Sequence, residues 1–359
     1  MQAAVFHAAH EPLTIEEVDI DDPQPREVLV RTIASGVCHS DLHFVDGLYP
    51  LPGPAVLGHE AAGIVEAVGD QVTEFAPGDR VIACLSVFCG TCERCTSGHT
   101  TQCTNRPTRR RDETPRLSMG GDPVVQFANV GGYAEKMLLH ENGIVKIEQE
   151  IGFDRAALIG CGVTTGLGAV LNTAHIEAGS TVAVFGVGGV GLAAIQGARI
   201  GGALKIIAVD TIESKLATAR ELGATHIVDA SSRDPVEAIR DLTGGGADYT
   251  FECIGLKVTA EQAYESIRPG GTATIVGMIP VVQKIEIDGP SMLTEKKLHG
   301  SSMGSNRFKS DMPKYIEFYL QGRLLLDEMI TRRGELSDVN EFFRAMKEGE
   351  VARSVIMFE

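Results

Sequence analysis

Residues 181–191, TVAVFGVGGVG, decide the fold of the second half of the chain. An apolar run typical of a buried strand leads into Gly186, Gly188 and Gly191 in the spacing G-x-G-x-x-G, where a helical stretch begins. Gly186 permits the tight turn, Gly188 lets a pyrophosphate approach the backbone, and Gly191 lets helix and strand pack closely. Asp210 ends the next apolar run, at a place where a carboxylate binds the adenosine ribose and repels a 2′-phosphate. The pattern predicts a site for NAD rather than NADP; the alternative is a glycine turn that serves packing alone.

Outward from this stretch, apolar runs alternate with amphipathic segments. Such alternation is typical of a doubly wound parallel α/β sheet, and we expect a Rossmann domain over residues 163–304. We predict helices over residues 190–200, 213–222 and 259–267, and a further helix that begins at residue 235. The predicted parallel strands are residues 181–185, 205–209, 226–229, 249–253, 272–276 and 297–302.

The two ends of the chain have a different sequence pattern. Residues 1–162 hold short β-like runs between Gly- and Pro-rich stretches, and residues 305–359 contain a helical pattern and a final β-like run. A chain of 359 residues exceeds what one hydrophobic core usually supports. We therefore expect two domains, with a β-rich one formed by residues 1–162 and 305–359.

Charge and hydropathy restrict the class of partner. The formal net charge of −16 argues against nucleic acid and anionic membranes as partners. No window holds the about 18 uninterrupted apolar residues of a membrane span, and the N-terminal residues lack the basic and apolar regions of a secretory signal. We therefore expect a cytoplasmic protein. The charge run Arg109–Arg111 is interpreted as a solvated polar loop.

Four cysteines predict a structural zinc site. They follow the spacing C-x2-C-x2-C-x7-C within a lobe of about residues 88–104, and four thiolates so close in sequence can enclose one tetrahedral zinc. Disulfides and an iron–sulfur cluster are the alternatives, but a ferredoxin-type run has a shorter last spacing and then a proline, where this chain has Thr104. The predicted ligands are Cys89, Cys92, Cys95 and Cys103.

Cys38, His59 and Cys161 are also of zinc-binding type, although no spacing rule joins them and each alone has an ordinary structural explanation. With the motifs around these residues, the chain resembles the zinc-dependent alcohol dehydrogenases of the medium-chain dehydrogenase/reductase superfamily. The resemblance extends from the N-terminal runs to Arg353. It rests on CHSDLH at 38–43, GHE at 58–60, GDRV at 78–81, the four-cysteine lobe, GGYAE at 131–135, GCG at 160–162 and GVGGVG at 186–191.

The resemblance implies a fold and two zinc ions per chain. The Rossmann domain would be inserted in a GroES-like catalytic domain, and Cys38, His59 and Cys161 would bind a catalytic zinc with one coordination position left open. Asp41 would orient His59, and Glu60 would lie behind the zinc and influence ligand exchange. Ser40 and His43 would relay the proton of an alcohol that is oxidised with hydride transfer to NAD.

The same resemblance implies further contacts to the cofactor. His39 and Arg353 would bind the pyrophosphate, and Thr165 would pack on the nicotinamide. Lys215 would contact the adenosine ribose, although a lysine at this position of a helix is often only solvated.

The substrate pocket departs from several relatives at Tyr49 and Leu85. A leucine in place of an aromatic residue opens space, which favours a primary alcohol with room for a branched or aromatic one. The alternatives are a thiol-dependent formaldehyde dehydrogenase, which uses charged groups where this chain has Tyr49, and an enzyme with tightly bound NAD. A catalytically idle NAD-binding scaffold is the remaining alternative. We expect a homodimer formed by edge pairing of the nucleotide-binding sheets near residues 294–303.

Overall fold

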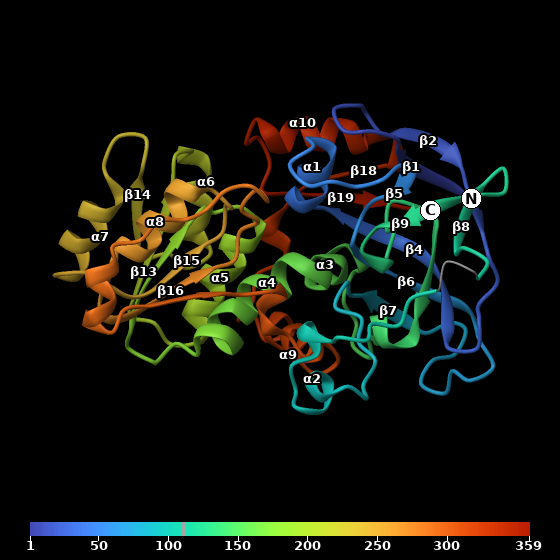
Figure 1. Cartoon of the computed structure of the whole chain (residues 1–359), viewed down its shortest axis with the longest axis horizontal. Helices are drawn as coiled ribbons and strands as arrows, with labels where there is room; N and C mark the ends of the chain where they lie inside the picture. Colours follow the sequence, from blue (N-terminus) through green and yellow to red (C-terminus); the bar gives the residue numbers. More distant parts are fainter. Residues whose placement is uncertain (110–112) are drawn as a thin grey trace. The chain divides into compact units, whose positions relative to one another are not determined.

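The computed structural model describes residues 1–109 and 113–359 (Figure 1). Within these residues the chain divides into two compact units. Unit 1 comprises Met1–Cys161, Arg307–Leu320 and Ile330–Glu359; unit 2 comprises Gly162–Asn306 and Gln321–Met329. The predicted domain limits, 162/163 and 304/305, differ from these contact-based limits by two residues or fewer, except that Gln321–Met329 joins unit 2.

Unit 2 is built on one parallel six-stranded sheet with the order β14-β13-β12-β15-β16-β17. This is the order of a Rossmann domain, and the strand order reverses between β12 and β15. The predicted parallel sheet is therefore confirmed, with small shifts at strand ends. The strands are β12 (Thr181–Phe185), β13 (Lys205–Asp210), β14 (His226–Asp229), β15 (Ala247–Glu252), β16 (Ile267–Ile275) and β17 (Lys297–Gly300).

Helices connect these strands, as the alternation predicts. α5 (Gly189–Ile200) opens directly at the glycine turn, and α6 (Glu213–Glu221), α7 (Pro235–Thr243) and α8 (Lys257–Glu265) follow successive strands (Figure 1). Strand β12 is buried because its residues Val182–Phe185 pack on both faces of the sheet. The unit also contains α4 (Thr164–Gly168) and the short turns η5 (Ala169–Ala174), η6 (Gly289–Thr294), η7 (Met303–Ser305) and η8 (Asp327–Met329).

Unit 1 consists of two β-sheets and a few helices. A seven-stranded sheet has the order β11-β7-β6-β4-β19-β18, with β10 also paired to β4, and a six-stranded sheet has the order β2-β1-β5-β9-β8-β3. The strands are β1 (Gln2–Phe6), β2 (Thr14–Glu17), β3 (Asp19–Ile20), β4 (Glu27–Val37), β5 (Ala55–Val56), β6 (Glu60–Val68), β7 (Arg80–Ala83), β8 (Leu117–Met119), β9 (Asp122–Gln126), β10 (Lys136–His140), β11 (Ile144–Lys146), β18 (Ile330–Gly334) and β19 (Arg353–Met357).

The two ends of the chain meet in this unit. The C-terminal strand β19 pairs antiparallel with β4, so that blue and red segments lie side by side in Figure 1. The helices are α1 (His39–Val45), α2 (Glu93–Thr96), α3 (Phe153–Leu158), α9 (Phe308–Leu320) and α10 (Val339–Lys347), with the turns η1 (Thr100–Gln102), η2 (Phe127–Asn129), η3 (Glu141–Gly143) and η9 (Leu336–Asp338). The π-helical turn η4 (Ile159–Val163) carries the chain into unit 2.

One helical stretch, Phe153–Ala174, has the length and hydropathy of a membrane span. Because 83% of its most apolar window is buried inside the protein, it has the character of a core helix, which passes the same test.

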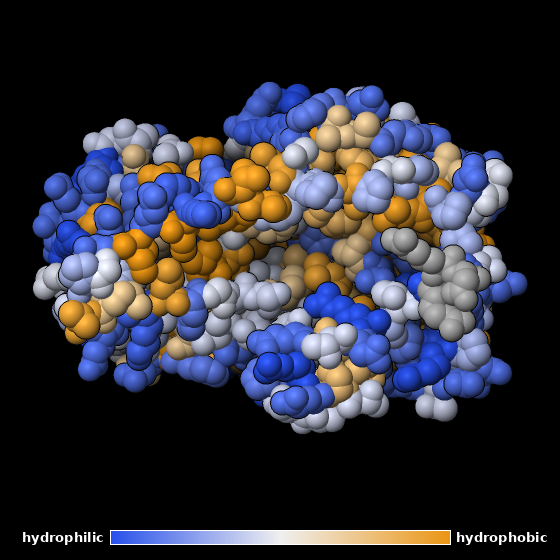
Figure 2. Space-filling view, in the orientation of Figure 1, coloured by the Kyte–Doolittle hydropathy of each residue, from blue (hydrophilic) through white to orange (hydrophobic). Residues whose placement is uncertain are grey.

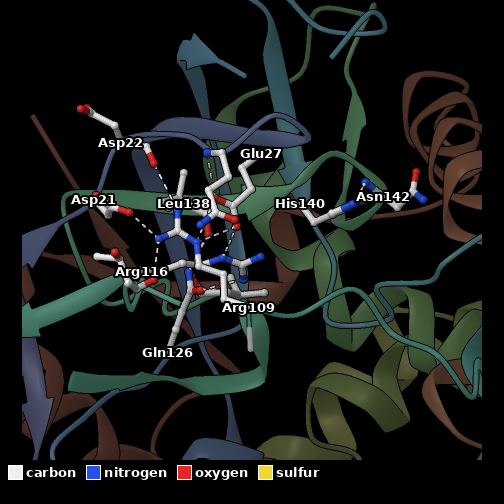
Figure 3. A network of polar contacts seen from close by, with 12 residues as sticks. Asp21, Asp22, Glu27, Arg109, Arg116, Gln126, Leu138, His140 and Asn142 are labelled. Carbon is white, nitrogen blue, oxygen red and sulfur yellow. Dashed lines mark hydrogen bonds and ion pairs between the residues drawn. The ribbon is translucent and has the colours of Figure 1, made fainter. Parts of the chain in front are cut away.

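A buried ion network ties Arg109 and Arg116, which follow the four-cysteine lobe, to the start of β4. The Arg109 and Arg116 guanidinium groups converge on the Glu27 carboxylate at the start of β4 (Figure 3). Arg116 Nε lies 2.7 Å from Glu27 Oε1, and Arg109 Nη1 also lies 2.5 Å from Asp21 Oδ2. The side chain of Arg109 is only 6% exposed, so the interpretation as solvated surface is wrong for this residue. Arg110 and Arg111 lie outside the described residues.

Replacing Glu27 should destabilise the protein in a pH-dependent way. Burial raises the pKa of Glu27, but the hydrogen bond from Arg109 and the charge of Arg116 outweigh it, so the pKa falls below its ordinary 4.5. The stabilisation is therefore complete above pH 4.5 and is lost as pH falls through the lower, folded-state pKa. We expect Glu27→Gln to cost about 3 kcal/mol of unfolding free energy at pH 7, because it leaves the buried Arg116 guanidinium without its carboxylate and Arg109 with Asp21 alone.

Urea unfolding of both proteins between pH 7 and pH 3 measures this effect. Glu66→Gln is the matched control, since Glu66 pairs with Arg31 and Lys136 on the surface and should matter by less than about 1 kcal/mol. A deficit in Glu27→Gln that stays constant down to pH 3 would contradict the ion network as its cause.

Candidate active site

Three segments of unit 1 bring their metal-binding side chains together. Cys38 follows β4 and precedes α1, His59 precedes β6, and Cys161 lies in the π-helical turn. Their donor atoms and a carboxylate oxygen of Glu60 all lie within 4.8 Å of one another, and all four residues are buried. Cys38 and His59 come close together because β4 and β6 are paired neighbours in the sheet, which their spacing in the sequence did not indicate. Two thiolates and one imidazole fit a catalytic zinc, which needs three protein ligands and an open position.

His59 is held in one orientation by Asp41. The His59 Nδ1 atom lies 3.0 Å from Asp41 Oδ1, and the same oxygen accepts the backbone N–H of Gly58 at 3.1 Å. Asp41 and His59 are both almost completely buried. Because the carboxylate accepts a hydrogen bond from Nδ1–H, the lone pair of Nε2 stays available for a metal. This is the arrangement that the orienting role predicted for Asp41 requires.

The electrostatics of the cluster favour a cation. Burial lowers the pKa of His59, but Asp41 and the Cys38 thiolate outweigh it and raise the value to about 10. A hydrogen bond from Cys161 holds the pKa of Cys38 well below its ordinary value despite burial, and His59 acts in the same direction. The Cys38 thiolate is thus balanced by the proton on His59, and a bound dication would replace that proton.

Glu60 and Arg353 form a buried ion pair beside the cluster. The Arg353 Nη2 atom contacts Glu60 Oε2, and both side chains are 5% exposed or less. The carboxylate also packs against Gly36 of β4, where a Cβ atom would lie 2.5 Å from Glu60 Oε2. Glu60 therefore lies next to the predicted zinc position, as expected. Arg353 faces this carboxylate in the structure, and its contact to the pyrophosphate stays a prediction.

Helix α1 carries the predicted proton relay. Ser40 and His43 are three residues apart in this helix and so lie on one face. Burial lowers the pKa of His43 below its ordinary value, so its imidazole is neutral at pH 7 and can accept a proton. Its ring stacks on Tyr49 with centroids 6.2 Å apart, and the ring of His39 approaches it edge-on at 5.7 Å.

Two phenylalanines that the sequence analysis missed also lie at this site. Phe127 approaches the His59 ring edge-on at 5.8 Å, and Phe44 approaches Phe127 at 4.7 Å and Tyr49 at 5.8 Å. Together they form an apolar aromatic wall next to the metal-binding imidazole. Leu85, the other predicted pocket residue, is partly buried and packs against a core cluster of β4, β6, β7 and β10. Phe127 stands in an irregular turn, where no periodicity marks a residue as functional.

The four cysteines of the lobe also converge. Their Sγ atoms lie within 4.8 Å of one another, with Cys92 and Cys95 3.5 Å apart. Backbone N–H groups of Thr91 and Cys92 point at the Cys89 sulfur, at 3.4 and 3.3 Å. A backbone hydrogen bond from Thr104, together with one from Cys95, lowers the pKa of Cys92 to about 5. These N–H groups stabilise thiolates, and four converging thiolates fit a structural zinc.

Four of the predicted cofactor residues of unit 2, the three glycines and Asp210, form or contact the glycine turn. Gly186 has a φ of +83°, and a Cβ atom on Gly191 would lie 1.8 Å from the Gly186 oxygen, so both positions require glycine. Gly188 is the N-cap of α5, and a helix N-terminus at such a turn favours an anionic ligand. Asp210 Oδ2 accepts the backbone N–H of Val187 at 2.9 Å. Asp210, the residue predicted to bind the ribose, thus also fixes the glycine turn predicted to bind the phosphates.

Thr165 and Lys215 lie elsewhere in the same unit. Thr165 is buried in α4 and donates its hydroxyl to the sulfur of Met303 at 3.3 Å. Lys215 is half-buried on α6, directly after β13. Both remain predicted cofactor contacts.

Comparison with known proteins places both halves of the chain. Residues 24–149 match the family model of the alcohol dehydrogenase GroES-like domain, and residues 189–321 match that of zinc-binding dehydrogenases. The chain is 39% identical to "Alcohol dehydrogenase class-3" of Oryza sativa subsp. japonica, over 99% of this chain and 96% of the relative. It is 38% identical to "S-(hydroxymethyl)glutathione dehydrogenase" of Haemophilus influenzae, over 99% and 97%.

Solved structures agree with these matches. Benzyl alcohol dehydrogenase from Acinetobacter calcoaceticus superposes with a TM-score of 0.94 at 32% identity, over 100% of this chain and 99% of that one. The predicted Rossmann domain inserted in a GroES-like domain is confirmed.

Removing one ligand from each cysteine cluster should separate the two metals. We expect Cys38→Ser to abolish turnover and lose about one zinc per chain while the far-UV circular dichroism stays native, since the two remaining predicted ligands, His59 and Cys161, stay buried and packed. Cys92→Ser should lose the other zinc and lower the thermal midpoint, because the lobe is held by its metal. Metal analysis, turnover and thermal unfolding of both variants test this division, and equal activity loss with equal unfolding would refute it.

Proposed function

We propose that the chain, which belongs to the zinc-dependent alcohol dehydrogenase family of the medium-chain dehydrogenase/reductase superfamily, oxidises a primary alcohol to the aldehyde, reversibly, with hydride transfer to NAD. The observation that carries this proposal is the buried set of Cys38, His59 and Cys161 with its orienting carboxylate. Zinc bound there would act as the Lewis acid that makes the hydroxyl acidic, or polarises the carbonyl in the reverse direction.

The side chains of the chain would perform the remaining steps. Asp41 holds the His59 imidazole in the tautomer that binds a metal. The released proton has to leave a buried site, and the neutral His43, with Ser40 on the same face of α1, can accept and pass it on. NAD would supply the hydride acceptor, and we assign its pyrophosphate to the turn of Gly186, Gly188 and Gly191.

Asp210 supports NAD over NADP. Its carboxylate is fixed by backbone N–H groups of Val187, Thr211 and Ile212, at 2.9, 2.8 and 3.1 Å. A fixed negative charge at the end of the second strand repels a 2′-phosphate and accepts the hydroxyls of an unmodified ribose.

Two substrate classes are supported by different observations. The aromatic wall of Phe44, Phe127 and Tyr49 favours an alcohol with an apolar or aromatic substituent. The Haemophilus relative, which by its name acts on S-(hydroxymethyl)glutathione and matches almost the whole chain, favours the hydroxymethyl adduct of a thiol with formaldehyde. Both substrates present a primary hydroxyl to the same site.

Formation of NADH, followed at 340 nm, tests the function and ranks the substrates. The purified protein is given ethanol, a longer primary alcohol, benzyl alcohol or a formaldehyde–thiol mixture, with NAD, with NADP and without added cofactor. We expect turnover with NAD and about two zinc ions per chain. A preference of tenfold or more for the thiol adduct would select the second class, and a preference for benzyl alcohol would select the first.

Other results would contradict the proposal in specific ways. NADH absorbance already present on the protein, without turnover, would indicate tightly bound NAD. Absence of both zinc and turnover would favour an idle NAD-binding scaffold.

We also propose a homodimer that pairs unit 2 with its copy along β17. This strand is the edge of the sheet, paired only with β16 among the described strands. Exposed hydrophobic side chains gather on the visible face of this unit, over α8 and the segment after β16 (Figure 2). Close to β17 in sequence, Met292 is 45% exposed and Leu293 is 89% exposed. An unpaired edge beside exposed apolar residues is typical of an interface between subunits.

Sedimentation velocity tests the dimer. Leu293→Asp should shift the protein from dimer toward monomer, since it would bury a charge in the proposed interface. Leu204→Asp is the matched control, because Leu204 is also strongly exposed (77%) but precedes β13, away from the β17 edge of the sheet. A monomeric wild type, or equal dissociation of both variants, would refute this interface. The cytoplasmic location stays a prediction.

A further inference from the structure

Tyr133 is connected to the predicted catalytic zinc through two hydrogen bonds. Its side chain is fully buried, and its hydroxyl donates to Asp41 Oδ2 at 2.8 Å. The other oxygen of that carboxylate, Oδ1, lies 3.0 Å from His59 Nδ1. The hydroxyl, the carboxylate and the imidazole therefore form one continuous chain of buried polar groups that ends at a metal-binding atom.

The backbone of Tyr133 holds the same segment a second time. The N–H of Tyr133 donates to the Leu57 oxygen at 3.0 Å, and the N–H of Gly132 donates to the Gly58 oxygen at 2.8 Å. Gly58 has a φ of +86°, and a Cβ atom there would lie 2.5 Å from the Tyr133 ring. The ring thus packs directly on the backbone that precedes His59, and the GGYAE motif fixes the GHE motif.

The hydroxyl itself has a specific task in this arrangement. Asp41 is 0% exposed, and Tyr133 is the only partner of its Oδ2 atom among the described residues. Without the hydroxyl, one oxygen of a buried carboxylate would lack a donor, which is costly in a medium of low polarity. The carboxylate would then rotate toward its remaining donors, Gly58 and His59, and the imidazole would lose its fixed direction.

We propose that Tyr133 is a positioning residue for the catalytic metal: its hydroxyl fixes Asp41, and Asp41 fixes His59 for zinc binding. The inference rests on the zinc site of the proposed function. A phenylalanine would fill the same space in the core, where the Tyr133 ring also meets Phe343 edge-on at 6.3 Å. The proposal therefore concerns the hydroxyl and not the ring.

Zinc release from the loaded protein tests the hydroxyl directly. A chromogenic zinc chelator in excess reports the release of each zinc ion as a separate kinetic phase. In Tyr133→Phe we expect zinc release from the Cys38–His59–Cys161 site to be about tenfold faster. Removing a group that supports a metal ligand typically weakens metal binding by about tenfold or more. Release from the four-cysteine lobe should be unchanged, and Cys92→Ser identifies which phase belongs to the lobe.

Tyr264→Phe is the matched control for a general loss of stability. Tyr264 is as deeply buried, and its hydroxyl bonds Ser291 and Met292 in unit 2, remote in sequence from every predicted zinc ligand. This variant should leave both release phases unchanged. A double-mutant cycle with Asp41→Asn adds a second readout, because a hydroxyl that acts through Asp41 should have little further effect once that carboxylate is gone.

The outcomes separate the proposal from its rivals. Equal release rates in Tyr133→Phe and wild type, or full additivity with Asp41→Asn, would overturn it. Failure of Tyr133→Phe to fold, while Tyr264→Phe folds, would also overturn it, since the hydroxyl would then be required for the fold. A wild-type protein that holds zinc only in the lobe would instead contradict the proposed function.

Discussion

The burial of two thiols, an imidazole and a carboxylate at one point is the constraint on which the rest of the structure depends. Cys38, His59, Glu60 and Cys161 are 5% exposed or less, and ionised groups at such a place are costly unless a cation balances them. The Arg353 guanidinium compensates Glu60 at one side, and Asp41 is compensated by the proton that it shares with His59. The two cysteines would carry two negative charges once both are deprotonated, and these match one dication.

This constraint explains why both ends of the chain belong to one unit. Arg353 lies at the start of β19, the C-terminal strand, and Glu60 lies at the start of β6. Both strands pair with β4, one on each side, so the Arg353 side chain reaches Glu60 across this one strand. A chain that ended before β19 would lose the guanidinium and leave Glu60 buried without its partner. The C-terminal residues therefore contribute to the metal site through charge, although none of them is a predicted zinc ligand.

The sequence predicted those parts whose physical cause is local. The glycine turn, its strand and helix, and the four-cysteine lobe each lie within one short stretch, and the structure has them within a few residues of the predicted places. Cys38, His59 and Cys161 lie far apart in the sequence, so only a resemblance to a family could join them. Arg109 was misinterpreted because its partners, Asp21 and Glu27, lie more than 80 residues away, and a charge run shows nothing of what faces it.

Phe127 was missed, and Tyr133 was noted only as part of the GGYAE motif without a role, for a related reason. Both lie in the segment that connects β9 to β10, where neither helical nor strand periodicity marks a functional face. Their proximity to His59 arises because Gly132 and Tyr133 bond to the backbone of Leu57 and Gly58, across a sequence distance that no motif spans. The same short segment thus places an aromatic ring against the His59 imidazole and a hydroxyl on its supporting carboxylate. If the proposed roles of Phe127 and Tyr133 hold, a change in the backbone path of this segment should affect both substrate preference and zinc retention.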